Sequence, residues 1–406
     1  MKKYIISAVA FLIVGYFLLV LSMLIPNALL QDNVNASAIE LNRYGDYPSI
    51  FVYGTYLESF CDADYIAVAY NQRSDNPFFN ALDAFNYCYD EENVSCRGVK
   101  ALALASNGEG KNIYEHSHAW HGYRIFLRPL LVKYSIEDIR WIAATIIFLL
   151  TTSICLLMYK ASGESKSCVP FLFSFLFFSF QLESISICIA IQFLLMLVPC
   201  IFILVGCIKE KELPFFFFCM FVTGMCSGFF ALCDLPALSI GFPIITMLAF
   251  NRKKFDKVNA ALRMILFWGI GYIVIPAPKF LINEYFMKLK GASRVITRYT
   301  GITDRIGIMD RLTQISWIFG EAFKFNRARS EALIFVMLVI TIIVILKKKY
   351  KHIVFNDVIA YVFVAMIPLF WIIIMVRASY LIWTVFLFSI TIYAVMQYLW
   401  KLLHAK

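Results

Sequence analysis

Apolar segments long enough to cross a lipid bilayer recur along the whole 406-residue chain, separated by polar turns. A membrane-spanning helix needs about 20 mostly apolar residues, because each residue of a helix rises about 1.5 Å. The pattern predicts about ten such helices. They lie near residues 4–26, 139–159, 168–183, 187–208, 214–232, 235–250, 258–279, 331–347, 355–376 and 380–400. We therefore expect an all-α polytopic integral membrane protein.

Lysine and arginine residues predict how these helices cross the membrane. If the N-terminus lies inside the cell, the cytoplasmic loops are 160–166, 209–211, 252–257, 347–351 and the C-terminal tail, and each of them is basic. This agrees with the positive-inside rule. The first apolar segment has about 22 residues, longer than the roughly 7–15 of a signal peptide, and therefore predicts an uncleaved anchor. We expect a protein of the cytoplasmic (inner) membrane with both termini in the cytoplasm.

Two longer polar segments interrupt the apolar pattern, and both are predicted to lie outside the cell. The first is a large extracytoplasmic loop between spans 1 and 2, and the second is an Arg-rich loop. The expected division of the chain is 1–26 (first anchor), 27–138 (loop domain), 139–280 (spans 2 to 7), 281–330 (Arg-rich loop) and 331–406 (spans 8 to 10).

The composition agrees with a membrane protein and argues against nucleic-acid binding. Hydrophobic residues make up 61% of the chain and charged residues only 16%, whereas a soluble domain has about 45–50% and about 25%. The formal net charge is +10, but the lysines lie in short loops between apolar segments, as membrane topology requires. We therefore expect a lipid bilayer, and no nucleic acid, as the partner of this surface.

Most of the cysteines fall within apolar segments, but three lie in the first outer loop. These are Cys61, Cys88 and Cys96. The outside of a cell is an oxidising setting for many proteins, so one disulfide among the three is expected. The sequence leaves its connectivity open.

Acidic residues in the first outer loop are candidates for a catalytic base. In "YLESFCDADYIAVAYN" (56–71), Glu58 and Asp62 lie four residues apart and would share one face of a helix. Carboxylates grouped at a low-dielectric boundary raise each other's pKa, which suits a general base or a metal ligand. Helix capping or a solvated loop would explain the same residues without any chemistry.

Basic residues gather in "YEHSHAWHGYRIFLRPLL" (114–131), just before the second predicted span. On a helix, His118 and His121 would share a face that continues to Arg124 and Arg128, and such a face could bind phosphate. Anchoring of the next helix to lipid headgroups would explain the arginines equally well. The usual short-spaced Cys/His ligand set of a zinc site is missing, so we predict no metal site here.

Further polar residues fall at the ends of predicted spans on the outer side. Lys279 ends the seventh span and Arg377 ends the ninth, and the second outer loop adds Arg294 and Arg298. Ionisable residues within spans are functional candidates, although residues at span ends can also extend into the headgroup region. Together with the previous set, the predicted phosphate-binding residues are His118, His121, Arg124, Arg128, Lys279, Arg294, Arg298 and Arg377.

This layout of one anchor, a long acidic outer loop and many further spans resembles the GT-C glycosyltransferases, although no subfamily signature of those enzymes is complete. It is also similar to bacterial multipass proteins encoded among surface-polysaccharide genes. The similar blocks are "HGYRIFLRPLL" (121–131), "IRWI" (139–142), "DLP" (234–236) and "WGIGY" (268–272). "FCDA" (60–63) replaces their Tyr-Thr-Asp-Ala and keeps Asp62, whereas "RAS" (377–379) replaces their Asn-His-Ser and lacks the histidine.

The resemblance implies a glycosyltransferase that takes a sugar from a polyprenyl-phosphate-linked donor and passes it to a glycan acceptor of the cell envelope. It implies Asp62 as catalytic base, with Asp46 second, and a divalent cation such as Mg²⁺ or Mn²⁺ as an optional cofactor. The arginines would hold the leaving lipid phosphate. Two other functions stay open, an O-antigen-type polysaccharide polymerase or ligase and a flippase or transporter of lipid-linked intermediates. The sequence does not specify the sugar, the acceptor or the oligomeric state.

Overall fold

A computed structural model shows how the chain folds. It describes residues 2–46, 49–51, 55–56, 59–88, 98–108, 112–115, 119–179, 186–230, 236–282, 338–346, 353–374 and 381–404. The structure is mostly helical, as expected, and it adds two small antiparallel sheets of two strands each.

The first predicted span is α1 (Lys2–Met23), and the polar segment after it folds into a domain. We call the described residues between α1 and α7 the loop domain. Its elements are η1 (Asn27–Leu29), α2 (Gln31–Tyr44), β1 (Ser49–Phe51), β2 (Thr55–Tyr56), α3 (Ser59–Tyr70), α4 (Pro77–Leu82), β3 (Phe85–Cys88), α5 (Val99–Asn107), β4 (Asn112–Glu115) and α6 (Arg124–Leu131). Strand β1 pairs with β2, and β3 pairs with β4 from Phe85↔Glu115 to Cys88↔Asn112.

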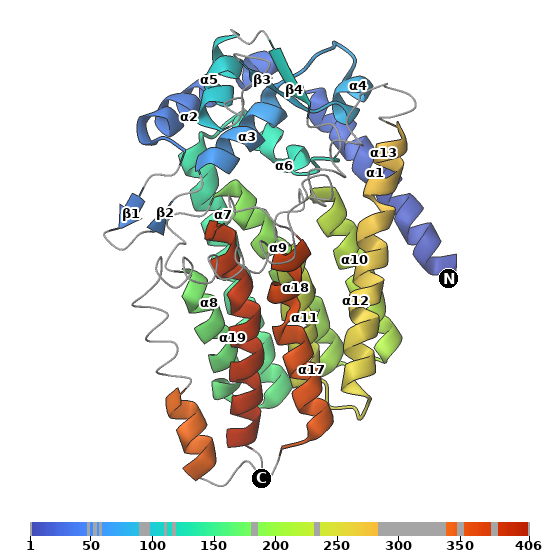
Figure 1. Ribbon diagram of the computed structural model, residues 1–406. Coiled ribbons are helices and arrows are strands. Elements are labelled where there is room, and N and C mark those ends of the chain that lie inside the picture. Colours follow the sequence, from blue (N-terminus) through green and yellow to red (C-terminus); the bar gives the residue numbers. More distant parts are fainter. Residues whose placement is uncertain are drawn as a thin grey trace.

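Long apolar helices form the rest of the described structure, and the loop domain lies across one end of them (Figure 1). They are α7 (Ile136–Ser162), α8 (Val169–Ser179), α9 (Ile187–Ile208), α10 (Leu213–Phe230), α11 (Pro236–Phe250), α12 (Lys257–Val274), α13 (Pro276–Leu281), α17 (Phe355–Ala365), α18 (Ile367–Ile374) and α19 (Leu381–Leu403). The short η2 (Ser165–Cys168) joins α7 to α8, and residues 338–346 are also helical. The C-terminus lies at the end opposite the loop domain.

By length and composition, five helices among the described residues are able to cross a membrane. They are Lys2–Met23, Ile136–Ser162, Ile187–Ile208, Leu213–Phe230 and Lys257–Leu281, and two shorter apolar helices are Pro236–Phe250 and Phe355–Phe370. Large apolar side chains such as Phe148 and Leu156 of α7 are exposed on the outside of the bundle, where lipid would cover them. The structure supports a membrane protein, and the total of ten spans stays a prediction.

One hydrophobic core extends from the loop domain into the bundle. Its buried members include Leu30, Val34, Tyr65, Ile66, Leu127, Ile139, Met196, Ile245, Val364 and Tyr393. These residues come from the loop domain and from the helices α7, α9, α11, α17 and α19. Because both parts bury apolar surface in the same core, the position of the loop domain on the bundle is well defined.

Glycine lets helices α10 and α12 pack with their backbones in contact. A Cβ atom at Gly224 would lie 2.0 Å from the carbonyl oxygen of Trp268, and one at Gly271 would lie 2.1 Å from that of Phe221. No side chain larger than hydrogen fits at these distances. Close approach through small residues is a common way to associate helices in membranes.

Replacing Gly224 with alanine therefore forces α10 and α12 apart. We expect Gly224→Ala to lower the stability of the purified protein in detergent by roughly 1–3 kcal/mol, measured as a lower thermal unfolding midpoint. Gly269→Ala is the matched control, because a Cβ atom at Gly269 of α12 meets nothing within 4 Å. Equal midpoints for the two variants would contradict the proposed close packing.

Candidate functional site

The junction between the loop domain and the bundle contains most of the described residues that the sequence predicts to be functional. The segment before α6 contacts the ends of two long helices. The indole N–H of Trp120 donates to the carbonyl oxygen of Ile275 at 2.7 Å, directly after α12. The backbone N–H of Gly122 donates to the carbonyl oxygen of Phe229 at 2.9 Å, in the last turn of α10. Both donors therefore bind carbonyl groups at helix ends, where unpaired carbonyl groups are found.

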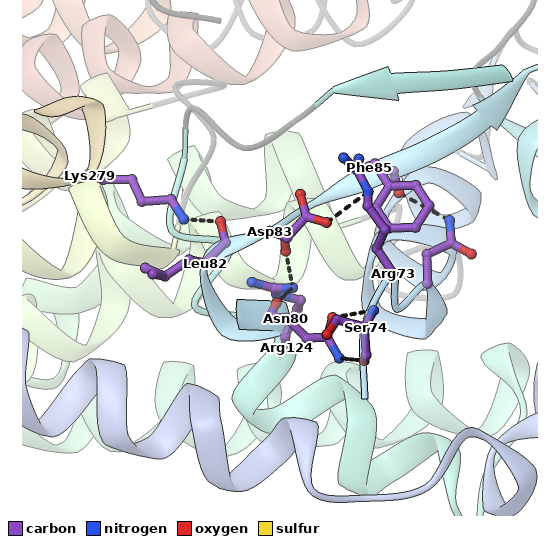
Figure 2. A network of polar contacts seen from close by, with 9 residues as sticks. Arg73, Ser74, Asn80, Leu82, Asp83, Phe85, Arg124 and Lys279 are labelled. Atoms are coloured by element: carbon purple, nitrogen blue, oxygen red, sulfur yellow. Dashed lines mark hydrogen bonds and ion pairs between the residues drawn. The ribbon is translucent and has the colours of Figure 1, made fainter. Parts of the chain in front are cut away.

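Arg124 binds the end of α4. Its Nη1 donates to the carbonyl oxygens of Asn80 at 3.1 Å and Asp83 at 2.8 Å, and its Nη2 donates to that of Ala81 at 2.8 Å. The ammonium group of Lys279 donates to the carbonyl oxygen of Leu82, between them. Two buried cations thus bind four consecutive carbonyl groups, and Figure 2 shows the side chains of Arg124 and Lys279 converging on this segment.

Ion pairing continues this network on the other side of the same segment. Arg73 Nε lies 3.2 Å from Asp83 Oδ2, and the guanidinium group of Arg73 also lies 4.7 Å from the ring centre of Phe85. Lys279 Nζ lies 5.3 Å from the ring centre of Trp120. Figure 2 shows how Asp83 lies between Arg73 and Arg124. The sequence prediction had singled out neither Arg73 nor Asp83.

Arg128 joins two further helix ends, one on each side of the junction. Its Nε donates to the carbonyl oxygen of Ser22 at 2.9 Å, and its Nη2 donates to that of Ile25, both at the end of α1. Its Nη1 donates to the carbonyl oxygen of Ala69 at 2.5 Å, in the last turn of α3. The planar guanidinium group can do this because its donors point in several directions.

The two arginines of α6 remain cations although they are buried. Removal from water lowers the pKa of Arg124 and of Arg128 to about 10, which is still well above neutral pH. The carbonyl groups carry the partial negative charge of helix C-termini and replace the lost water. The cationic groups of Arg124, Arg128 and Lys279, predicted to bind phosphate, bind backbone carbonyls of the protein itself. This geometry favours a structural role for all three.

Asp62, the first choice for a catalytic base, is fully buried at the same junction. Its Oδ2 lies 2.6 Å from Nη2 and 2.8 Å from Nε of Arg140, in the second turn of α7. Its Oδ1 accepts the backbone N–H of Ile187 at 2.6 Å, at the start of α9. Burial raises the pKa of the Asp62 carboxyl group, while Arg140 and the amide groups of Ile187 and Cys188 oppose this change.

Asp46, the second candidate base, binds the start of α5. Its Oδ1 accepts the N–H of Val99 at 3.0 Å, and Oδ1 of the neighbouring Asp64 accepts the N–H of Gly98 at 2.8 Å. Gly98 has a φ of 70°, and a Cβ atom there would lie 2.4 Å from the Phe60 ring. Both acids therefore supply the negative charge that a helix N-terminus attracts. The capping explanation that the sequence left open for the acids of residues 56–71 describes the contact of Asp64, and Asp46 binds the same helix start.

His121 does not continue a helical face with Arg124, as the sequence pattern had suggested. The helix α6 begins only at Arg124, and His121 precedes it with a φ of 51°, which is left-handed backbone. Its Nδ1 lies 3.2 Å from the hydroxyl oxygen of Tyr123, whose ring stacks on Tyr65 with ring centres 4.1 Å apart. The bonds of Trp120 and Gly122 to α12 and α10 hold the backbone on both sides of His121.

Several predicted residues lie outside the described part of the chain. They are Glu58, His118, Arg294, Arg298 and Arg377, and also Cys96 and the side chain of Cys88. The predicted disulfide is therefore untested. Among the described residues, no group of three or more His, Cys, Asp or Glu side chains is placed to hold a metal ion. Asp62 already binds Arg140 and the amide of Ile187, and Asp46 binds the amide of Val99. These two residues therefore do not fit a divalent-cation site.

Sequence reasoning missed Arg140, the ion-pair partner of Asp62, and Glu40, which interacts with Arg140. Arg140 follows Glu137 and Asp138 at the start of an apolar segment, and a lone arginine there was a usable signal. Glu40 of α2 interacts with the same turn. Burial and the nearby charge of Glu137 raise the pKa of Glu40, and Arg140 lowers it. The hydroxyl group of Ser37, one turn earlier, accepts the N–H of Ile136 at 2.9 Å and so places α2 against α7.

Comparison with models of known protein families, with curated proteins and with solved structures gives no match to this chain.

Arg128 can be tested as the residue that joins α1 to α3. We expect Arg128→Lys to lower the free energy of unfolding by about 3 kcal/mol, because a lysine ammonium group cannot reach both helix ends and leaves buried carbonyls unpaired. Thermal unfolding in detergent, followed by size-exclusion chromatography, measures the loss. Arg43→Lys on the exposed side of α2 is the control, and similar losses for both would argue against this role.

Proposed function

We propose that the protein is a membrane glycosyltransferase resembling the GT-C enzymes. It would transfer a sugar from a polyprenyl-phosphate-linked donor to a glycan acceptor of the cell envelope, on the outer face of the cytoplasmic membrane. One observation carries the proposal, the buried carboxyl group of Asp62 at the junction of the loop domain with α7 and α9. An amphiphilic donor presents its polar head at this level, where a folded domain meets membrane helices.

In the proposed reaction, Asp62 accepts the proton of the acceptor hydroxyl group as that oxygen forms a bond to the anomeric carbon. The bond between this carbon and the phosphate oxygen breaks, and the electron pair leaves with the lipid phosphate. A carboxyl group with a raised pKa suits a general base. Arg140 keeps the carboxyl group oriented, and one contact of Asp62 must open when the proton arrives.

The growing charge on the leaving phosphate needs cationic partners. We assign this role to Arg294, Arg298, Arg377 and His118, because the described candidates Arg124, Arg128 and Lys279 bind helix carbonyls. His121, also of the predicted phosphate set, lies in the loop domain, where its Nδ1 is 3.2 Å from the hydroxyl oxygen of Tyr123. No step is assigned to a metal ion.

Asp62→Asn tests the base directly. The amide keeps the size of the side chain and can still accept the N–H of Ile187, but it cannot take a proton. We expect at least about a hundredfold loss of sugar transfer per folded protein, in line with removal of a general base, measured with purified protein and a polyprenyl-phosphate sugar in liposomes.

Two matched variants separate catalysis from folding. Arg140→Gln breaks the same ion pair from the other side, and Asp75→Asn changes an exposed acid of the loop domain. If the ion pair has a purely structural role, Asp62→Asn and Arg140→Gln will lower the amount of folded protein equally. The folded protein that remains will then transfer sugar at the normal rate. Products of many lengths would favour a polymerase, and movement of the lipid without a glycosidic product would favour a transporter.

Orientation in the membrane provides an independent test. We expect a cysteine at Asp75 of the loop domain to react with a membrane-impermeant maleimide in intact cells. A cysteine at Lys211, between α9 and α10, should react only after the cells are permeabilised. Both positions are exposed, so access through the membrane decides the result. Labelling of Lys211→Cys in intact cells would place both sites outside and contradict the proposed topology.

A further inference from the structure

A group of charged side chains joins three helices at the end of the bundle opposite the loop domain. Asp357 of α17 is nearly buried, with 9% of its side chain exposed. Its Oδ1 lies 2.8 Å from Nζ of Lys257, the first residue of α12, and its Oδ2 contacts Nζ of Lys401 in the last turn of α19. Figure 1 shows these three helix ends next to one another.

The group carries more positive than negative charge. Two lysines share the single carboxylate of Asp357, so the formal sum is +1. The ammonium groups are also close enough to interact with each other. Another ion pair at this end, between Lys253 and Glu212, is balanced, because one positive charge meets one negative charge. Asp357 has only 9% of its side chain exposed and Lys257 has 20%, whereas Lys401, with 44%, is about as exposed as Lys253, with 37%.

Hydrogen-bonding capacity also remains at this place. An ammonium group has three N–H donors, and Asp357 uses one from each lysine. One helical turn further into the bundle, the hydroxyl group of Tyr361 and Oε1 of Gln397 have no hydrogen-bond partner within the described ranges. Tyr361 follows Asp357 by four residues and Gln397 precedes Lys401 by four. Both therefore lie one helical turn closer to the loop domain than the charged group. The hydroxyl group of Tyr361 can donate a hydrogen bond to an anion, whereas Oε1 of Gln397 only accepts hydrogen bonds and is no ligand for one.

A simple structural role would explain only part of this arrangement. An ion pair that ties α12 to α17, or α17 to α19, requires one lysine and one acid. The second lysine adds repulsion between cations and the cost of a partly desolvated charge. An anion that accepts hydrogen bonds from both ammonium groups would remove this cost, since charge-assisted bonds to phosphate are among the strongest in proteins.

We propose that Lys257 and Lys401 bind the phosphate group of an anionic ligand at this end of the protein. The ligand is either the headgroup of an anionic phospholipid or a soluble phosphate monoester, and the two share the same recognition chemistry. Lys257 lies at the first residue of a helix long enough to span a membrane, which is where lipid headgroups are expected. Asp357 positions both lysines and weakens the binding by its own negative charge.

The experiment measures thermal stabilisation of the purified full-length protein by added ligand. One arm uses nanodiscs of phosphatidylcholine with increasing phosphatidylglycerol, and the other uses glycerol 3-phosphate in detergent. A ligand that binds the folded state raises the unfolding midpoint with its concentration. We expect Lys257→Gln and Lys401→Gln each to weaken the apparent affinity about tenfold, the loss typical of one charged hydrogen bond.

Two controls make the result specific. Lys253→Gln removes an exposed lysine at the same end and should leave the affinity unchanged. Asp357→Asn should strengthen binding severalfold, because it removes the only negative charge in the group, even if it lowers the stability without ligand. Stabilisation by phosphatidylglycerol alone would identify a lipid, and stabilisation by both would identify the phosphate group as sufficient. No stabilisation in either arm, or equal weakening by Lys253→Gln, would overturn the proposal.

Discussion

The described structure depends on charged side chains placed at the ends of helices. Every helix leaves unpaired N–H groups at its start and unpaired carbonyl groups at its end, and a buried end needs partners. In this protein, carboxylates of Asp62, Asp46 and Asp64 bind helix starts. Arg124, Arg128 and Lys279 bind helix ends. In each case the sign of the charge opposes that of the helix dipole. Among these contacts, those of Asp62 with Ile187, Arg128 with Ser22 and Lys279 with Leu82 attach the loop domain to the bundle, and the others hold the loop domain together.

This arrangement explains why a membrane protein can carry charges in such a buried place. A lone buried cation would be costly, whereas one surrounded by several carbonyl groups keeps most of what water provided. The continuous hydrophobic core then excludes water around these contacts and strengthens them. The same features limit the functional interpretation. Side chains that already bind several backbone carbonyls are poor ligands for a substrate, so Asp62 is a better candidate for chemistry at this junction than Arg124, Arg128 or Lys279.

The sequence predicted the helices far better than the contacts between them. The spans predicted at 187–208 and 235–250 agree closely with α9 (Ile187–Ile208) and α11 (Pro236–Phe250), because continuous apolar runs between polar turns determine both. The sequence pattern also selected Asp62, Arg124 and Arg128 as unusual. Most of their partners could not be predicted, since they are backbone groups far away in the chain, such as Ile187 for Asp62, although the side chain of Arg140 also binds Asp62. The small strands and the left-handed backbone at His121 depend equally on such distant contacts.

The contact of Arg128 with the end of α1 has a consequence for biogenesis. The carbonyl group of Ser22 and its partner Arg128 are 106 residues apart in the chain. At a ribosomal rate of about 5–20 residues per second, roughly 5–20 s pass between the synthesis of α1 and that of Arg128. During this interval the end of α1 lacks its arginine partner. The apolar surface of α1 is therefore complete well before the polar contact at its end can form.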